Sequence, residues 1–186
     1  MNDLAAAEKS TCQSQYPICV QIGTGVEQLP AFEDYSMKGR TYRYFTGIPL
    51  YPFGYGLSYS KFTYSNLKLS TDTVMAGESL TVEADVRNMS EVGGDEVVQL
   101  YLIFPADDGA PLRALRSFSR VHLVPGMTQR VQFTLSPRDL SMVNLAGDRT
   151  IAPGNYRISV GGGQPGTGAA TVETKVSIRG QQSLPE

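Results

Sequence analysis

Apolar and polar residues alternate with a period of two through much of the chain after residue 61. The clearest stretch is Leu80–Arg87, in which Leu, Val, Ala and Val alternate with Thr, Glu, Asp and Arg. Successive side chains of a β-strand point to opposite faces, so this pattern puts one face against a core and the other toward water. The same alternation recurs in Val131–Leu135, Tyr156–Val160 and Val172–Ile178. Such strands must bury their apolar faces against one another.

Further strands complete the expected set. Val97–Phe104 is nearly all apolar, which indicates a central strand covered on both faces. Short strands at Leu67–Leu69 and Val121–Leu123 bring the number to about seven. Turn residues separate them: Ala76-Gly77, Gly93-Gly94, Asp107-Asp108-Gly109, Pro125-Gly126, Pro153-Gly154 and the run from Gly161 to Gly168. The pattern predicts an all-β, immunoglobulin-like or fibronectin-like sandwich over residues 62 to 180.

Irregular segments flank and interrupt these strands. Residues 1 to 28 show no sustained period and are expected to form a poorly ordered tail, with Pro17–Ile22 as its one short strand. Residues 181 to 186 are expected to form a second tail. Ser136–Leu140 predicts one helical turn, with Ser136 as the N-cap and Pro137 at the first helical position.

The chain has two cysteines, Cys12 and Cys19, both in the N-terminal tail. Two are too few for a zinc site, and their spacing differs from that of a C-x-x-C redox pair. We expect free thiols, with a disulfide in an oxidising compartment as the alternative. The absence of Trp and of any later Cys excludes an antibody-type domain.

Residues 29 to 61 are expected to form an aromatic linker arm. Nine Tyr and Phe residues lie between Tyr42 and Tyr64, and they are interrupted by three Gly and two Pro. Glycine and proline at this density are expected to forbid a helix and to break any long strand. An irregular segment with so many rings must lie against another surface.

Guanidinium groups and rings are combined in Gly39–Phe45, with the sequence GRTYRYF. In an extended backbone, each face of this segment carries an arginine beside aromatic rings. This composition suits protein docking or stacking on sugars, and the alternative is an arm folded back onto its own sandwich. The predicted docking or sugar-stacking surface consists of Arg40, Tyr42, Arg43, Tyr44, Tyr51, Phe53 and Tyr55.

Several kinds of chemistry are not expected. A formal net charge of −2 provides no general attraction to nucleic acid or anionic lipid. His122 is the one histidine and is expected to face solvent, and no metal site or cofactor is predicted. Gly161–Gly166 fits G-x-G-x-x-G but precedes a strand, so it predicts a hairpin loop. Glu33 and Asp34 are neighbours in an extended segment and point apart, unlike the carboxylate pair of a glycosidase.

Five stretches carry a resemblance to a known family. They are Leu29–Met37, GRTYRYF at 39 to 45, PLYPFGYGLSYSKFTYSNLKLS at 49 to 70, LRSFSRVHLVPGMTQRVQFTLSPRDLS at 115 to 141, and APGNYRISVGG at 152 to 162. Together they closely resemble the C-terminal region of family 3 glycoside hydrolases, the β-glucosidases and β-xylosidases. In that region an aromatic linker leads into a fibronectin type III-like domain. The resemblance runs from about Val26 to Gly180.

The resemblance implies that the catalytic residues lie elsewhere. In this family of retaining β-glycosidases, a catalytic barrel and an α/β sandwich domain precede the module. The nucleophile is a barrel aspartate, typically in a Ser-Asp-Trp setting, whereas this sequence has no Trp and no Ser-Asp pair. The acid/base glutamate also belongs to preceding loops. The chain alone is therefore expected to be a non-catalytic fragment, with residues 1 to 28 as at most a remnant of the α/β domain.

The implied function is an accessory, stabilising domain that packs against the catalytic and α/β domains, in cis or in trans. One alternative is a carbohydrate-binding module for plant polysaccharide, which the lack of Trp disfavours. Another is a fragment with weak glycosidase activity. The rings of the arm also predict self-association. No signal peptide or span of about 20 apolar residues is found, although members of the family are often periplasmic or secreted.

Overall fold

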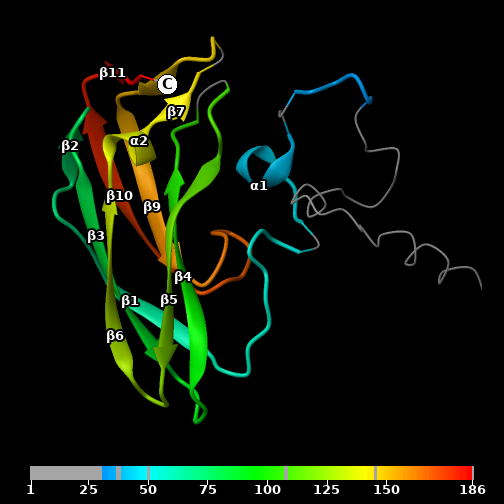
Figure 1. The fold of residues 1–186 in the computed structure, drawn as a ribbon, viewed down its shortest axis with the longest axis vertical. Helices are drawn as coiled ribbons and strands as arrows, with labels where there is room; N and C mark the ends of the chain where they lie inside the picture. Colours follow the sequence, from blue (N-terminus) through cyan, green and yellow to red (C-terminus); the bar gives the residue numbers. More distant parts are fainter. Residues whose placement is uncertain (1–30, 37–38, 50, 107–108, 145, 186) are drawn as a thin grey trace, which may run out of the picture.

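The computed structural model describes residues 31–36, 39–49, 51–106, 109–144 and 146–185. They form a β-sandwich with two single-turn helices (Figure 1). The seven strands of eight or more residues are β1 (Phe62–Leu69), β3 (Leu80–Asn88), β4 (Gly94–Ile103), β5 (Arg113–Leu123), β6 (Thr128–Leu135), β9 (Gly154–Gly161) and β10 (Thr171–Arg179). The predicted all-β sandwich of about seven strands is confirmed. The strand expected at Pro17–Ile22 and both cysteines lie outside the described residues.

The long strands form two sheets that face each other in Figure 1. One has the order β1-β3-β6. The other has the order β2-β10-β9-β4-β5, in which the short β2 (Thr73–Met75) pairs in parallel with β10 and the other neighbours are antiparallel. A small third sheet of β7 (Met142–Val143), β8 (Arg149–Ile151) and β11 (Gln182–Ser183) lies at one end.

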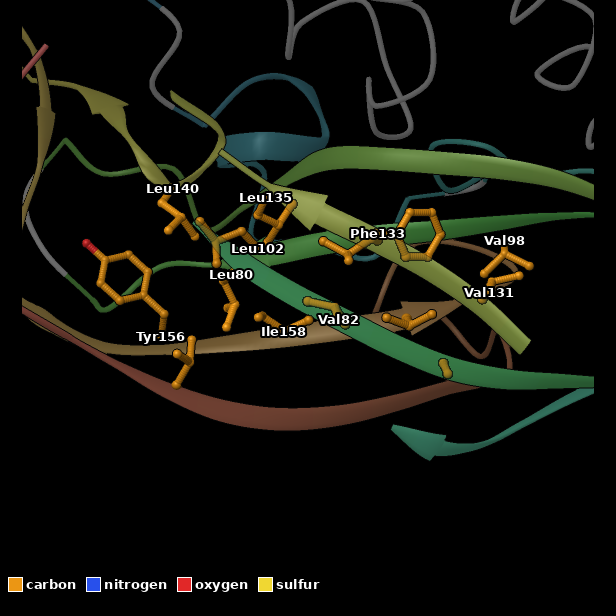
Figure 2. Packing of buried hydrophobic residues seen from close by; sticks show 14 of the residues in the cluster. Leu80, Val82, Val98, Leu102, Val131, Phe133, Leu135, Leu140, Tyr156 and Ile158 are labelled. Carbon is orange, nitrogen blue, oxygen red and sulfur yellow. The ribbon is translucent and has the colours of Figure 1, made fainter. Parts of the chain in front are cut away.

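The core lies between the two sheets and contains the apolar half of each alternating strand. Val82 of β3 is opposite Phe133 of β6, and both side chains are buried. In the facing sheet, Leu102 of β4 is opposite Ile158 of β9, and both are fully buried. Figure 2 shows these four side chains within one apolar layer between the ribbons. The period-two prediction of the buried faces is confirmed for these strands.

β1 begins five residues before the expected strand at Leu67–Leu69. The sequence pattern missed this first part because a register shift interrupts the strand. Asn66 lies in this shift with a left-handed φ of 53°. Its Nδ2 donates to Asp85 Oδ2 at 2.8 Å, which stabilises the irregular backbone. An inserted residue reverses the phase of the alternation, so a strict period of two detects only the part after the shift.

β5 is longer than expected for the same reason. The sequence pattern indicated only Val121–Leu123, whereas the strand starts at Arg113. Its pairing with β4 changes register so that Ser117 and Leu115 face consecutive β4 residues, and Arg116 between them has no partner. Arg116 is therefore the extra residue of a β-bulge.

The segment expected as a C-terminal tail contains β11. Gln182 and Ser183 pair with Ile151 and Thr150 of β8, and Leu184 packs against the core. Two-residue strands such as this have no readable period, because alternation needs several residues to be recognised.

The helical turn at Ser136 is confirmed. α2 (Pro137–Leu140) has Pro137 in its first turn and a capping box. Ser136 N donates to Asp139 Oδ2 at 2.9 Å, and Asp139 N donates to Ser136 Oγ at 3.4 Å. The turn buries Leu140 against the core.

A second helical turn, α1 (Thr41–Tyr44), contradicts the prediction that the arm has no helix. After Gly39, which precedes the helix, the next glycine or proline is Gly47, so the residues of α1 are free to make one turn. Phe45 N donates to Thr41 O at 3.0 Å, which closes it. The faces expected for an extended Arg40–Phe45 segment are therefore wrong. Neither helix in the described ranges has the length or hydrophobicity that crossing a bilayer requires.

Candidate functional site

The arm meets the sandwich through Tyr42, on the face of β4 and β5 that points away from the core (Figure 1). The ring of Tyr42 stacks on Phe53, with centroids 4.2 Å apart and an interplanar angle of 21°. It also meets Tyr101 of β4 edge to face at 6.3 Å. The Tyr42 hydroxyl accepts a hydrogen bond from Leu115 N of β5 at 3.3 Å. These contacts cover the second face of β4, as the apolar run Val97–Phe104 predicted.

A chain of polar contacts continues beneath these rings. The Tyr101 hydroxyl donates to Gln99 Oε1 at 2.7 Å, and burial raises the pKa of Tyr101 above its usual range. Gln99 Nε2 donates to Gly162 O at 3.4 Å, at the end of β9. Phe53 N donates to Gln164 Oε1 at 3.2 Å, and Gln164 is 2% exposed. The arm is thus tied to both β4 and the β9–β10 loop.

The backbone of the arm also contacts the sheet. Leu112 N donates to Arg43 O at 2.7 Å, just before β5. At Gly54, with φ 75°, an added Cβ would lie 3.0 Å from the amide of Gln99. Only glycine adopts this conformation readily and leaves this space, so Gly54 permits the close approach of the arm to β4.

Other rings of the arm point into solvent. Tyr51 is 55% exposed and Tyr55 is 54% exposed, with their ring centroids 5.2 Å apart. Further exposed apolar side chains of the arm are Phe32, Tyr35, Ile48, Leu57 and Tyr59. Together with Tyr51 and Tyr55 we call these residues the exposed arm surface.

The structure therefore divides the predicted surface. Tyr42 and Phe53 contact the chain's own sandwich, whereas Tyr51 and Tyr55 do not, and Tyr44 is half-buried. The remaining two predicted residues have separate roles: Arg40 pairs with Asp34 at 2.6 Å, and the Arg43 guanidinium lies 5.9 Å from the Tyr42 ring centroid. The fold-back interpretation therefore describes Tyr42 and Phe53, and the docking surface stays a prediction for the exposed rings.

A cleft of about 410 Å³ separates the arm after Pro52 from the β9–β10 loop. Tyr64 and Glu96 lie in it, and the Tyr64 hydroxyl donates to Glu96 Oε1 at 2.6 Å. Burial is the main cause that raises the pKa of each of the two groups above its ordinary value. Sequence reasoning missed Glu96, although it shares the inward phase of Val98 and Leu100 on β4, and a carboxylate in that phase is a detectable signal.

His122, the glycine-rich loop and the possible metal ligands can also be compared with the sequence predictions. His122 faces solvent as predicted, and its Nδ1 lies 2.6 Å from Asp95 Oδ1. Gly161–Gly166 belongs to the hairpin connection between β9 and β10, which pair from Gly161 and Thr171 onward, so the predicted loop is confirmed. Within the described ranges, no group of three or more potential metal-ligating side chains is found.

Comparison with known proteins identifies relatives of this domain. The profile of the family described as fibronectin type III-like domain matches residues 96–164. A β-xylosidase of Formosa agariphila is 39% identical over 145 residues, which cover 76% of this chain and 20% of the relative. A solved β-glucosidase 3B of Thermotoga neapolitana in complex with glucose matches with a TM-score of 0.67 and 29% identity, covering 78% of this chain and 19% of that one.

A solved GH3 β-glucosidase of Bifidobacterium adolescentis matches with a TM-score of 0.60 and 28% identity, covering 69% of this chain and 18% of that one. The chain therefore spans about a fifth of the length of the relatives it matches. The resemblance seen in the sequence is confirmed by these three comparisons, in family and in fold.

Proposed function

Because this chain contains the fibronectin type III-like domain found in β-glucosidases and β-xylosidases of glycoside hydrolase family 3, we propose that it is a non-catalytic accessory domain of such an enzyme. It packs against the catalytic and α/β domains and stabilises them. The observation that carries the proposal is the coverage: the match takes in 76% of this chain but 20% of the β-xylosidase. The matched region is therefore a small part of that enzyme.

The exposed arm surface supports the packing role. Monomeric proteins rarely expose contiguous apolar patches beyond a few hundred Å² unless the patch binds a partner. Tyr51 and Tyr55 present paired rings, and Leu57 and Tyr59 are almost fully exposed. The half-buried anchors Tyr42 and Phe53 hold the arm in place before docking, which lowers the entropy lost on association. We propose that this surface covers an apolar flank of the companion domains.

We infer structural rather than catalytic roles for Glu96, Asp85 and Asp139. Retaining glycosidases place two carboxyl groups about 5 Å apart on either side of the scissile bond. Glu96 in the cleft is bonded to Tyr64, Asp85 to Arg130, and Asp139 to the α2 cap. Each of these three carboxylates thus has a structural partner.

The packing proposal is tested by self-association, because an uncovered docking surface in the isolated chain will seek a second copy. We expect the weight-average mass from light scattering to rise with protein concentration, together with binding of an apolar dye. The triple variant Tyr51→Ser/Tyr55→Ser/Tyr59→Ser should lower both. Met75→Ser is the matched control, since Met75 is 51% exposed on β2, at the other edge of the five-stranded sheet. A wild-type chain that stays monomeric and binds no dye would overturn the proposal.

A carbohydrate-binding role is the second candidate, and the cleft beside the β9–β10 loop favours it. Phe53, Tyr55 and Phe62 line the cleft together with the polar groups of Glu96 and Gln164. Rings and hydrogen-bonding groups in one cleft suit a sugar. Affinity electrophoresis in gels with soluble xylan or β-glucan separates the candidates. If the wild-type chain is retarded in these gels and the Glu96→Gln or Tyr55→Ser variant is not, sugar binding is favoured over the accessory role.

A further inference from the structure

Arg116 occupies the bulge of β5, and its surroundings differ from those of a surface arginine. A bulge inserts one unpaired residue and redirects its side chain, and such features are common next to functional sites. Arg116 Nη2 donates to Ser141 O at 2.6 Å, and its guanidinium carbon lies 5.5 Å from the centroid of Phe104. Its Nε is buried and has no hydrogen-bond partner among the described residues. The cation is thus held by one neutral oxygen and a ring.

Two further guanidinium groups lie near Arg116. Arg149 Nη1 donates to Oγ of the same Ser141 at 3.2 Å. Arg43 Nε donates at 3.4 Å to the Tyr42 hydroxyl, which also accepts from Leu115, the residue before Arg116. β5, β8 and the arm therefore bring three cations to one place. We call Arg43, Arg116 and Arg149 the arginine cluster.

No described carboxylate forms an ion pair with a guanidinium group of the arginine cluster. The ion pairs within 4.0 Å among the described residues involve other arginines and His122. Asp139, which accepts from Ser136 in the capping box, acts on Arg116 without an ion pair and in the direction that raises its pKa. Burial, and next the charge of Arg43, lower the pKa of Arg116 to about 10. The fold therefore gathers three guanidinium groups, of which Arg116 is partly desolvated, and no described carboxylate pairs with them within 4.0 Å.

This arrangement is unfavourable for an isolated chain and favourable for a chain with an anionic partner. A half-buried cation without a counter-charge is destabilising, and removing one partner of a buried pair is costly for the same reason. Guanidinium groups bind a carboxylate with two parallel hydrogen bonds, which makes arginine suited to such pairs. A carboxylate contacting Arg116 and its neighbours would supply the missing charge.

We propose that the arginine cluster is a receptor site for the carboxylate of an acidic side chain on the domain against which this chain packs. The inference rests on the proposed accessory function and deepens it by naming the chemistry of one contact. Arg43 belongs to the same arm as the exposed rings. A Glu or Asp on the partner surface would fit the arginine cluster.

The test uses the full chain and a glutamate analogue as probe. Nε–Hε signals of the ¹⁵N-labelled protein are recorded during titration with N-acetyl-glutamate α-amide. We expect saturable shifts at Arg43, Arg116 and Arg149 that the neutral N-acetyl-glutamine α-amide does not produce. Arg120 and Arg157, which pair with Asp95 and Glu173, serve as internal controls. Linear shifts of similar size at all arginines, or equal shifts with the neutral analogue, would overturn the proposal.

Variants locate the site. Arg116→Gln should weaken binding of the glutamate analogue about tenfold or more, as loss of a charge-assisted bidentate contact requires. Arg157→Gln should leave the affinity unchanged. If Arg116→Gln fails to fold, Arg149→Gln provides the same comparison, because the Arg149 guanidinium joins the cluster through Ser141 Oγ. Affinity that neither substitution lowers would place the anion elsewhere and contradict the proposal.

The outcome is separable from that of the proposed function. Self-association and dye binding are measured without the analogue and depend on the rings of the arm. Analogue binding by a chain that stays monomeric would leave the site standing and remove the docking role of the arm. A self-associating chain that does not bind the analogue would support the docking role of the arm and contradict the carboxylate site.

Discussion

Tyr42 stacks on Phe53 at a centroid distance of 4.2 Å, so these two rings of the irregular arm close the segment between them into a loop over β4. The loop brings its own hydrogen-bond acceptor to the sheet, because the Tyr42 hydroxyl accepts from Leu115 N beside the β5 bulge. A bulge leaves backbone groups without strand partners, and this contact satisfies one of them. The arm is in this respect part of the sandwich.

Substitutions at Tyr42 should separate these two contributions. Tyr42→Phe keeps the stacked ring and removes the acceptor for Leu115 N, so we expect a loss of about 0.5 to 1.5 kcal/mol in the free energy of unfolding. Tyr42→Ala also loses ring contacts and should cost about 1 to 3 kcal/mol. Urea unfolding measures both. Tyr51→Ala is the control, since Tyr51 is 55% exposed, and an equal cost at Tyr51 would contradict the role of Tyr42 as anchor.

Asn88 should be essential to the end of β3. It is fully buried, and its Nδ2 donates to Val92 O at 2.8 Å and to Leu123 O at 3.0 Å. Asn88→Ala leaves these carbonyls unsatisfied and should cost about 1 to 3 kcal/mol in thermal or urea unfolding. The exposed Asn155 provides a control at which alanine should change stability by less than about 0.5 kcal/mol.

The buried amide of Asn88 also predicts that Asn88-Met89-Ser90 carries no glycan after expression in a eukaryotic host. Mass spectrometry of the purified chain checks this.

The sandwich should fold without the arm, because its two sheets bury each other's inner faces. We expect residues 62–185, which include β11, to unfold cooperatively in urea, at lower stability than the full chain since Tyr101 loses its cover. Phe133→Ala and Val82→Ala should each cost about 1 to 5 kcal/mol, with Phe133 toward the upper end. Val97→Ala is the control, because Val97 is 42% exposed. Gradual, non-cooperative unfolding would mean that the arm belongs to the folding unit.

Asp85 should make stability depend on pH. Hydrogen bonds from Arg130 and then from Asn66 hold the pKa of the Asp85 carboxyl below its ordinary value. A carboxyl whose pKa is lower in the folded state stabilises the fold above its unfolded pKa of about 3.9, and this contribution is lost as the pH falls through the folded value. The stability difference between wild type and Asp85→Asn should therefore be largest at neutral pH and shrink in acid. Arg130→Gln should reduce the same pH dependence, with the bond from Asn66 remaining; if the dependence is unchanged, another group is responsible.

Purified chain should not hydrolyse aryl β-glucosides or aryl β-xylosides. The expectation follows from the absence of a Ser-Asp-Trp sequence and from the structural partners that hold Glu96, Asp85 and Asp139. Product release is followed at high protein concentration after several purification steps. Turnover that co-purifies with the chain and falls in Glu96→Gln would show a catalytic carboxylate in the cleft and contradict the accessory role.

The sequence by itself determined the β-sandwich and much of its core. Side chains of a strand alternate between faces, so the spacing of Val82, Ala84 and Val86 was enough to assign them to the interior. The turn of α2 was equally readable, because a cap and its partner lie three residues apart along the chain. Such features depend on neighbours in sequence.

Tertiary structure alone decided how the arm is used. Composition identified Tyr42, Phe53, Tyr51 and Tyr55 as one aromatic group. In the structure Tyr42 contacts Tyr101 and stacks on Phe53, whereas Tyr51 and Tyr55 face solvent. An irregular segment has no period from which an inner face can be read, so burial depends on where distant strands pass.

The same limit hid the arginine cluster. Arg43, Arg116 and Arg149 are widely separated in sequence, and Arg116 is redirected by a bulge that breaks the period of two. Their convergence at Ser141 and Tyr42 is produced by the pairing of strands and the docking of the arm. Local patterns reveal which residues are buried along a strand, whereas only the packing of distant segments determines which charges meet.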